Sequence, residues 1–238
     1  ARAVAAGVGF LTTPQPAGQY NAAVGLLREA PTAAPCKYWL FNDNALAGRL
    51  LARLGHPSAG GILATLTAYG RERNGLHEVL WGERASETLD WCPRTHYYET
   101  LPAAAGIDPG AYACPEPNTP LIANEMRLGV PMPDWQEYAD LALYGALNQN
   151  LLGERKRARA TFTRAMANLF DWQAGGFADK AYRAESGYLT YKVGLALHVG
   201  AVLGALQGRE RERLVEIVLA QQEPSLPGKA GGFYTHYG

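Results

Sequence analysis

The chain has 238 residues, of which 47% are hydrophobic and 18% charged, a composition typical of folded rather than disordered proteins. Its 22 basic residues balance its 22 acidic ones, so the chain lacks the positive charge with which proteins usually bind nucleic acid. No stretch approaches the roughly 18 uninterrupted apolar residues that a membrane span needs, so no membrane span is predicted.

Apolar residues recur at helical spacing in seven segments, which we predict to be α-helices. Gly55, Gly153 and Gly208 are predicted to end three of them, and Asp134 is the predicted N-cap of another. The helix at about Tyr188–Leu206 is apolar on nearly all sides, so we expect it to be buried. The seven segments are Ala3–Thr12, Asn42–Leu54, Ser58–Arg73, Asp134–Leu151, Glu154–Phe170, Tyr188–Leu206 and Arg209–Gln222.

Short glycine turns join neighbouring helices into antiparallel pairs, whereas the connections between pairs are longer. Two of these longer connections contain Gly175-Gly176-Phe177 and Gly231-Gly232-Phe233, which are 56 residues apart. This is the length of one helix pair plus one long connection, so the sequence predicts an internal repeat. Tyr38–Leu40 and Gly187–Leu189 also precede two of the predicted helices in a similar way.

The segment 75–131 interrupts the helical pattern and is rich in proline. Glu78–Trp81 and His96–Glu99 resemble short strands, and a hairpin between them is one interpretation. His96–Glu99 also carries side chains that bind metals, but no second ligand stands at a suitable spacing, so no metal is predicted. We predict one α/α domain over residues 1–238 with a loop-rich insertion at 75–131.

Three cysteines, Cys36, Cys92 and Cys114, match no zinc-binding pattern. Cys92 and Cys114 lie in the same loop-rich stretch, where a disulfide between them and three unpaired thiols are both open interpretations. The sequence begins at Ala1 without a Met, for which removal of a leader and a fragment of a longer polypeptide are the two interpretations. A removed secretory leader favours an extracellular or cell-surface location; otherwise we expect a cytoplasmic one.

Helix pairs that repeat at this length and are linked by Gly-Gly-Phe turns resemble the α/α-toroid superfamily. The residues that carry the resemblance are Gly175–Phe177, Gly231–Tyr237 and Asn42–Asn44. Members of this superfamily include glycoside hydrolases, polysaccharide lyases, uronyl epimerases and terpene cyclases. The resemblance implies an all-α fold of antiparallel helix pairs in a full or partial ring, with a cleft at the loop rim. No cofactor is predicted. A complete ring needs more helices than the seven predicted, so an open ring or a missing part of the polypeptide is expected.

The long connections are rich in aromatic, amide and charged side chains. Sugars present flat apolar faces ringed by hydroxyl groups, so sugar-binding sites combine aromatic rings with acids and amides. The predicted substrate-binding residues are Tyr20, Asn21, Arg28, Trp39, Asn42, Tyr188, Tyr191, Lys192 and Tyr237.

Hydrolysis of a glycosidic bond needs two carboxyl groups, one on each side of the bond. We predict Asp43 as one of them, with Glu29, Asp179 or Glu185 as its partner. Asp43 belongs to the polar run Asn42–Asn44 directly before an apolar helix. The simpler interpretation of this run is that one of its residues only caps the helix.

Lyase or epimerase chemistry needs a base near the sugar and a cation for its carboxylate. His236 with Tyr234 or Tyr237 is the predicted base, and Arg28 or Lys192 the predicted cation. The simpler interpretations are an aromatic turn over the core for the tyrosines and a lysine that reaches along its helix to solvent.

Two functions therefore stay open. The first is a carbohydrate-active enzyme with a polysaccharide or glycan substrate. The second is a non-catalytic extracellular protein, such as a glycan-binding, surface-layer or filament component, which would form homo-oligomers or complete itself against a neighbour.

Overall fold

In the structure, which is a computed structural model, the chain forms two compact units. Unit 1 comprises Ala1–Arg73, Arg94–Leu128 and Glu223–Gly232, and unit 2 comprises Asn74–Pro93, Gly129–Gln222 and Phe233–Gly238. Each unit is described by itself, and the single domain with an insertion at 75–131 stays a prediction. The described residues are 2–14, 19–21, 24–28, 39–69, 79–83, 94–100, 121–127, 132–224 and 231–237, with backbone alone for 94–100 and 121–127.

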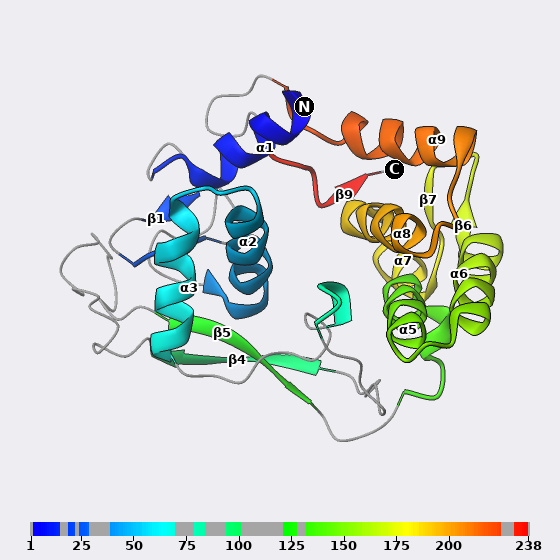
Figure 1. Ribbon diagram of the computed structural model, residues 1–238, viewed down its shortest axis with the longest axis horizontal. Coiled ribbons are helices and arrows are strands. Elements are labelled where there is room, and N and C mark those ends of the chain that lie inside the picture. The colour runs from blue at the N-terminus through cyan, green and yellow to red at the C-terminus, as the bar shows by residue number, and fades with distance from the viewer. Residues whose placement is uncertain are drawn as a thin grey trace. The chain divides into compact units, whose positions relative to one another are not determined.

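The described part of the chain is mostly helical and contains a few small sheets. The predicted helical class is therefore confirmed, whereas the ring arrangement of the helix pairs stays a prediction. In unit 1, α2 and α3 lie side by side as an antiparallel pair around the turn at Gly55 (Figure 1). Gly48 lets the two helices approach closely, because a Cβ at this position would lie 2.9 Å from Ile62 Cγ2. The helices of this unit are α1 (Arg2–Thr12), α2 (Phe41–Arg53) and α3 (Ser58–Tyr69).

The core of unit 1 forms where these helices meet short strands. Leu26, Trp39, Leu51 and Ile62 are fully buried there. In the three-stranded sheet, β5 lies between β4, to which it is antiparallel, and β3, to which it is parallel. The strands are β1 (Tyr20–Asn21), β2 (Leu26–Leu27), β3 (Trp39–Leu40), β4 (Arg94–Thr100) and β5 (Leu121–Arg127).

The strand predicted at His96–Glu99 is confirmed as part of β4, but the hairpin with Glu78–Trp81 is wrong. The partner of β4 is β5, and Val79 and Leu80 form a helical turn. Val79 is buried in the core of unit 2, so packing against helices determines the conformation of this short apolar run.

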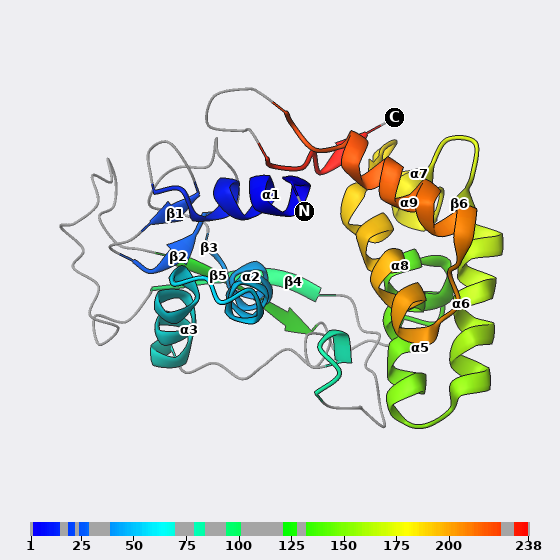
Figure 2. The same cartoon turned by 45° about the horizontal axis from the view of Figure 1, so that its top comes forward.

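Unit 2 contains two antiparallel helix pairs, α5 with α6 and α8 with α9, which pack together (Figure 2). A short 3₁₀ helix, η3 (Trp135–Glu137), precedes α5. The other elements are α5 (Ala139–Leu151), α6 (Arg155–Leu169), β6 (Phe170–Asp171), β7 (Gly176–Phe177), α7 (Lys180–Glu185), β8 (Tyr188–Leu189), α8 (Thr190–Leu203), α9 (Gly208–Ala220) and β9 (His236–Tyr237).

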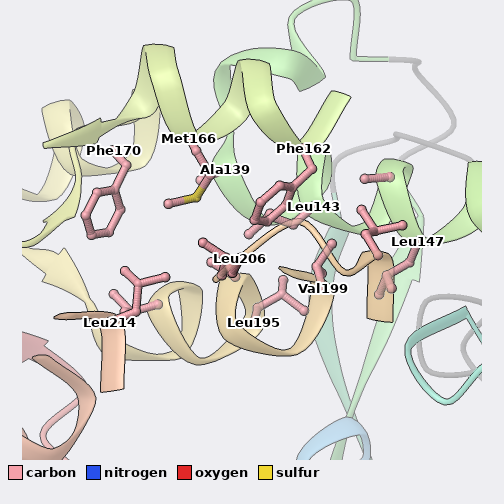
Figure 3. Packing of buried hydrophobic residues seen from close by; sticks show 14 of the residues in the cluster. Ala139, Leu143, Leu147, Phe162, Met166, Phe170, Leu195, Val199, Leu206 and Leu214 are labelled. Atoms are coloured by element: carbon pink, nitrogen blue, oxygen red, sulfur yellow. The ribbon is translucent and has the colours of Figure 1, made fainter. Parts of the chain in front are cut away.

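The core of unit 2 lies between these helices. Figure 3 shows Leu143 of α5, Phe162 of α6 and Val199 of α8 pointing into one interior, and all three are buried. Helix α8 is buried on most sides, as its all-round apolar pattern predicts, although Val202 stays about half exposed (48%).

Two predicted helix boundaries in unit 2 are wrong. Helix α5 begins at Ala139 rather than after Asp134, because η3 intervenes and Asp134 forms an ion pair with Lys180. Helix α8 ends at Gly204, which adopts a left-handed conformation (φ 58°), whereas Gly208 is the first residue of α9. The left-handed glycine terminates the helix before the apolar pattern itself ends.

The first Gly-Gly-Phe segment forms the second strand of a small hairpin after α6. Phe170 of β6 lies opposite Phe177 of β7. The amide of Gly175 donates to the carbonyl of Asp171 at 2.7 Å, and Gly175 has a φ of 80°. The loop therefore needs glycine at this position, because other residues rarely adopt a positive φ.

The second Gly-Gly-Phe segment pairs in a similar way after α9, but across a longer loop, since its first glycine follows its carbonyl partner by eight residues rather than four. Gln222 lies opposite Phe233, and the amide of Gly231 donates to the carbonyl of Glu223 at 2.7 Å. Gly231 has a φ of 90°. The equivalence of the two segments predicted from their sequence is confirmed at the level of the backbone.

A third hairpin of this kind, which the sequence pattern did not reveal, follows α1. Tyr20 of β1 lies opposite Leu27 of β2, and the amide of Gly25 donates to the carbonyl of Asn21 at 2.7 Å, with a φ of 73° at Gly25. Here Gly25-Leu26-Leu27 replaces Gly-Gly-Phe. Only the first glycine of the motif is common to the three hairpins, because it alone has the positive φ.

Candidate functional site

The starts of three helices in unit 2 meet at the carboxylate of Asp179. This carboxylate accepts hydrogen bonds from the amide of Ala139 at the start of α5 (2.8 Å) and from the amide of Tyr182 in α7 (3.0 Å). It also accepts one from Nζ of Lys192, in the first turn of α8, at 2.6 Å. Asp179 thus provides the cap of α5 that the sequence assigned to Asp134.

The ion pair between Asp179 and Lys192 is buried, with side-chain exposures of 0% and 2%. A charged group without access to water needs a partner of opposite charge and further hydrogen bonds, and Asp179 has both. Its place and its partners give Asp179 a structural role that joins α5, α7 and α8. Lys192 does not reach solvent along its helix as a surface lysine would.

The tight turns of unit 2 lie at the other end of its helices. Arg159, near the start of α6, donates to the carbonyl of Leu203 at 2.7 and 3.1 Å and to that of Gly204 at 3.2 Å. The turn at Gly153 before α6 therefore lies at the same end as the turn at Gly204 after α8. Within unit 2 the long connections and the tight turns therefore occupy opposite ends of the helices.

Exposed polar and aromatic side chains lie at the end with the long connections. The Tyr191 hydroxyl donates to Oδ2 of Asp140 at 2.8 Å. Thr190 binds the adjacent chain end twice: its hydroxyl donates to the carbonyl of Tyr234 at 2.5 Å, and its amide donates to that of Thr235 at 3.0 Å. We call Asp140, Tyr191, Tyr234, Thr235 and His236 the rim strip.

Tyr188 and Tyr237 lie beneath this strip rather than on it. Tyr188 is buried, stacks on Tyr182 with a ring-centre distance of 4.4 Å and lies 5.6 Å from the ring of Tyr237. The Tyr237 hydroxyl donates to the carbonyl of Gly175 at 2.6 Å and thereby links β9 to the β6–β7 hairpin. Burial, with a contribution from Tyr188, raises the pKa of Tyr237 to about 12, so this hydroxyl stays protonated at neutral pH.

Tyr191 is not placed to act as a base. The residue is about half exposed (53%), whereas its hydroxyl lies against Asp140. Burial of the hydroxyl, followed by the negative charge of Asp140, raises the pKa of Tyr191 well above its usual range. At neutral pH Tyr191 is therefore a hydrogen-bond donor.

In unit 1 the polar run Asn42–Asn44 lies within the first turn of α2 rather than before it, and the N-cap is Leu40, which offers no side-chain hydrogen bond. Asn44 is fully buried. Its amide group donates to the carbonyls of Leu27 and Leu40, both at 2.9 Å, and its Oδ1 accepts from the amide of Leu27 at 2.7 Å. Asn44 thus fastens β2 to α2. The interpretation that a residue of this run caps the helix is therefore wrong. In the sequence, the position of Asn44 on the apolar face of the helix is the feature that indicates its structural role.

Other predicted binding residues of unit 1 contribute to its packing. Trp39 is fully buried, and Asn21 is buried with its Oδ1 accepting from the amide of Val24 at 3.2 Å. A Cβ at Gly61 would lie 2.7 Å from the hydroxyl of Tyr20, so this tyrosine packs against α3.

The predicted carboxylate partners of Asp43 are only partly described. Asp43 is exposed on α2, in unit 1, whereas Asp179 belongs to unit 2. Arg28 is half-buried, and burial lowers its pKa. Glu29 and the side chain of Glu185 lie outside the described residues, so the hydrolytic pair stays a prediction.

The described residues contain no group of three His, Cys, Asp or Glu side chains that is arranged to hold a metal ion. Within the same ranges, no helix combines the length and apolar character that crossing a bilayer requires. Cys36, Cys92 and Cys114 lie outside the described residues.

Comparison of the chain with family models, with curated proteins and with solved structures gives no match. No relative therefore supplies a function or identifies a site residue. The function proposed below is inferred from the side chains of unit 2.

Proposed function

We propose that this protein binds carbohydrate at the rim strip of unit 2. The observation that carries the proposal is a pair of half-exposed tyrosine residues, Tyr191 (53% exposed) and Tyr234 (49%), whose segments are connected by the hydrogen bond from the Thr190 hydroxyl to the Tyr234 carbonyl. Aromatic rings of this kind stack on the apolar faces of sugars, while neighbouring carboxylate and imidazole groups bind sugar hydroxyls. Asp140 and His236 are the neighbouring groups here.

An α/α-toroid arrangement of the helix pairs is part of the same proposal. It is supported by the three equivalent hairpins and by the separation of tight turns from long connections within unit 2. In such an arrangement a glycan is bound at the end with the long connections. The rim strip lies at that end of α5 and α8.

Binding without hydrolysis is the function that the described carboxylates favour. Asp179 is enclosed and paired with Lys192, and Asp140 accepts a hydrogen bond from the Tyr191 hydroxyl. Hydrolysis needs two accessible carboxyl groups roughly 5–10 Å apart across the bond. We therefore propose a non-catalytic glycan-binding role, with an extracellular or cell-surface location.

The test uses isothermal titration of the full chain with cellohexaose, maltohexaose, xylohexaose and chitohexaose. We expect at least one of them to bind, and the Tyr191→Ala and Tyr234→Ala variants to lose about tenfold in affinity each, or about 1.4 kcal/mol. Trp172→Ala is the control, since Trp172 is an exposed ring (38%) outside the strip.

Two results would overturn the proposal. One is that none of the four oligosaccharides binds, and the other is that the tyrosine variants bind as the Trp172→Ala control does. Release of new reducing ends from any of these sugars would show hydrolysis and contradict the non-catalytic role.

A further inference from the structure

A groove of about 370 Å³ runs along α5 and α6 in unit 2 and continues to η3. It contains no residue of the rim strip. Besides apolar side chains its lining has an indole ring, two guanidinium groups, three amides, a hydroxyl and a carboxylate, among them those of Trp135, Glu137, Gln149, Arg157, Thr161 and Arg164. We call it the α5–α6 groove.

The helix that forms one wall of this groove is strongly basic. Within its 15 residues α6 has five cations and no acidic residue, namely Arg155, Lys156, Arg157, Arg159 and Arg164. The whole chain is neutral, so this is a local concentration of positive charge.

The two arginines of the groove differ in their present partners. Arg157 forms an exposed ion pair with Glu154 at 3.0 Å, and such surface pairs are weak enough to exchange for a ligand. Within the described residues the guanidinium group of Arg164 forms no hydrogen bond or ion pair. Its planar guanidinium therefore has its donors available for a carboxylate.

The remaining polar groups of the groove are also arranged as donors. The Thr161 hydroxyl donates to Oε1 of Gln149 at 2.8 Å. Because this hydrogen bond engages the amide oxygen of Gln149, its amide N–H groups are the donors that face a ligand. Glu137 is the one acidic residue among those that line the groove, against two arginines, and its carboxylate also pairs with Arg183 at 3.2 Å. A ligand rich in acceptors and negative charge fits these groups.

We infer that the α5–α6 groove binds an anionic oligosaccharide, with a uronate carboxylate on Arg164 and Arg157 and a sugar ring against Trp135. This site goes beyond the rim strip and does not depend on it. Arginine binds carboxylates through two parallel hydrogen bonds, and an indole face suits the flat side of a sugar ring.

The exposed side of α6 does not favour a membrane as the partner. Between Lys156 and Asn168 its exposed positions are Ala160, Thr163, Arg164 and Ala167 besides the other basic residues, and none is a large apolar side chain. Interfacial helices insert large apolar residues into the lipid, so a basic face alone is insufficient. A nucleic acid is disfavoured by the balanced charge of the chain.

The test measures binding of tetragalacturonate to the full chain at low salt, with maltotetraose as the neutral probe. We expect tetragalacturonate to bind at least tenfold more tightly than maltotetraose, and Arg164→Gln to reduce its affinity about tenfold. Arg164→Lys should recover only part of the loss, because lysine keeps the charge but not the planar pair of donors.

The control is Arg213→Gln on α9, which removes the same charge from an exposed helix position outside the groove, where Arg213 pairs with Glu216 at 3.5 Å. It should leave the affinity unchanged. Equal losses in the Arg164→Gln and Arg213→Gln variants would show a general charge effect and overturn the inference. Equal binding of both tetrasaccharides, or tighter binding of a single-stranded oligonucleotide or of anionic lipid vesicles, would overturn it too.

Binding at the α5–α6 groove can be distinguished from binding at the rim strip. The Tyr191→Ala and Tyr234→Ala variants should retain binding of tetragalacturonate, since neither residue lines the groove. If these variants lose it together with the neutral sugars, the groove is not an independent site.

Discussion

Two polar side chains that look like site residues in the sequence hold elements together in the structure. Asn44 fastens a strand to a helix in unit 1, and Lys192 pairs with Asp179 where three helices of unit 2 begin. Both are almost fully buried. Buried polar groups must find their hydrogen-bond partners within the protein. Residues of this kind therefore connect helices and strands that are far apart in the chain.

Lys192→Met tests this role in unit 2. Removing the ammonium group leaves the buried carboxylate of Asp179 with backbone amides alone, and we expect a loss of about 3–5 kcal/mol in the free energy of unfolding. The measurement is urea unfolding followed by circular dichroism.

Lys180→Met is the control for that measurement. It removes the same charge from an ion pair with Asp134 whose side chains are partly exposed, so the stability should stay near that of the wild type. Equal effects of the two substitutions would contradict a structural role specific to Lys192.

At the scale of elements, three hairpins with similar pairing follow α1, α6 and α9. Each places a glycine with positive φ at the same position, Gly25, Gly175 or Gly231. These glycines also lie close to other elements: a Cβ at Gly25 would lie 2.7 Å from the Thr65 hydroxyl and 3.0 Å from the Gly61 carbonyl. The hairpin thus needs glycine both for its turn and for its packing.

Gly25→Ala and Gly55→Ala separate these two requirements within unit 1. Both glycines have nearly the same φ, 73° and 69°, but a Cβ at Gly55 meets no atom within 4 Å. We expect Gly55→Ala to cost about 1–2 kcal/mol of unfolding free energy through backbone strain. Gly25→Ala should cost about 1–3 kcal/mol more, because its Cβ also overlaps α3.

The measurement for the glycine variants is chemical unfolding of both under the same conditions. If the two substitutions are equally destabilising, the close packing of the hairpin on α3 does not contribute to stability.

At the scale of the whole molecule, the described residues form two hydrophobic cores, one in each unit. The core of unit 1 contains Leu51 and Ile62, and that of unit 2 contains Leu143 and Val199. Because each unit has its own core, a cavity in one core should weaken that unit first.

Leu143→Ala and Leu51→Ala test this independence by hydrogen exchange with mass spectrometry. Both leucines are fully buried, and each substitution should cost about 2–5 kcal/mol in its own unit. We expect Leu143→Ala to increase exchange in α5, α6, α8 and α9, and Leu51→Ala to do so in α2 and α3. Increased exchange throughout the chain in both variants would mean that the two cores unfold together.

The sequence by itself determined seven helices of the described residues, because apolar periodicity is a local signal, but it did not reveal the short α7 and it misplaced the glycine that ends α8. It also indicated the equivalence of the two Gly-Gly-Phe segments and the aromatic character of the connections. The hairpin after α1 escaped detection because Leu26 and Leu27 replace the last two residues of the motif.

Only the tertiary structure decided what the polar candidates do. Nothing local distinguishes Tyr188, which is buried in an aromatic stack, from Tyr191, which is half exposed beside Asp140. The partner of Asp179 is 13 residues away and the helix start that it caps is 40 residues away. Burial and hydrogen bonding at such separations depend on how helices pack, and composition and spacing along the chain do not contain that information.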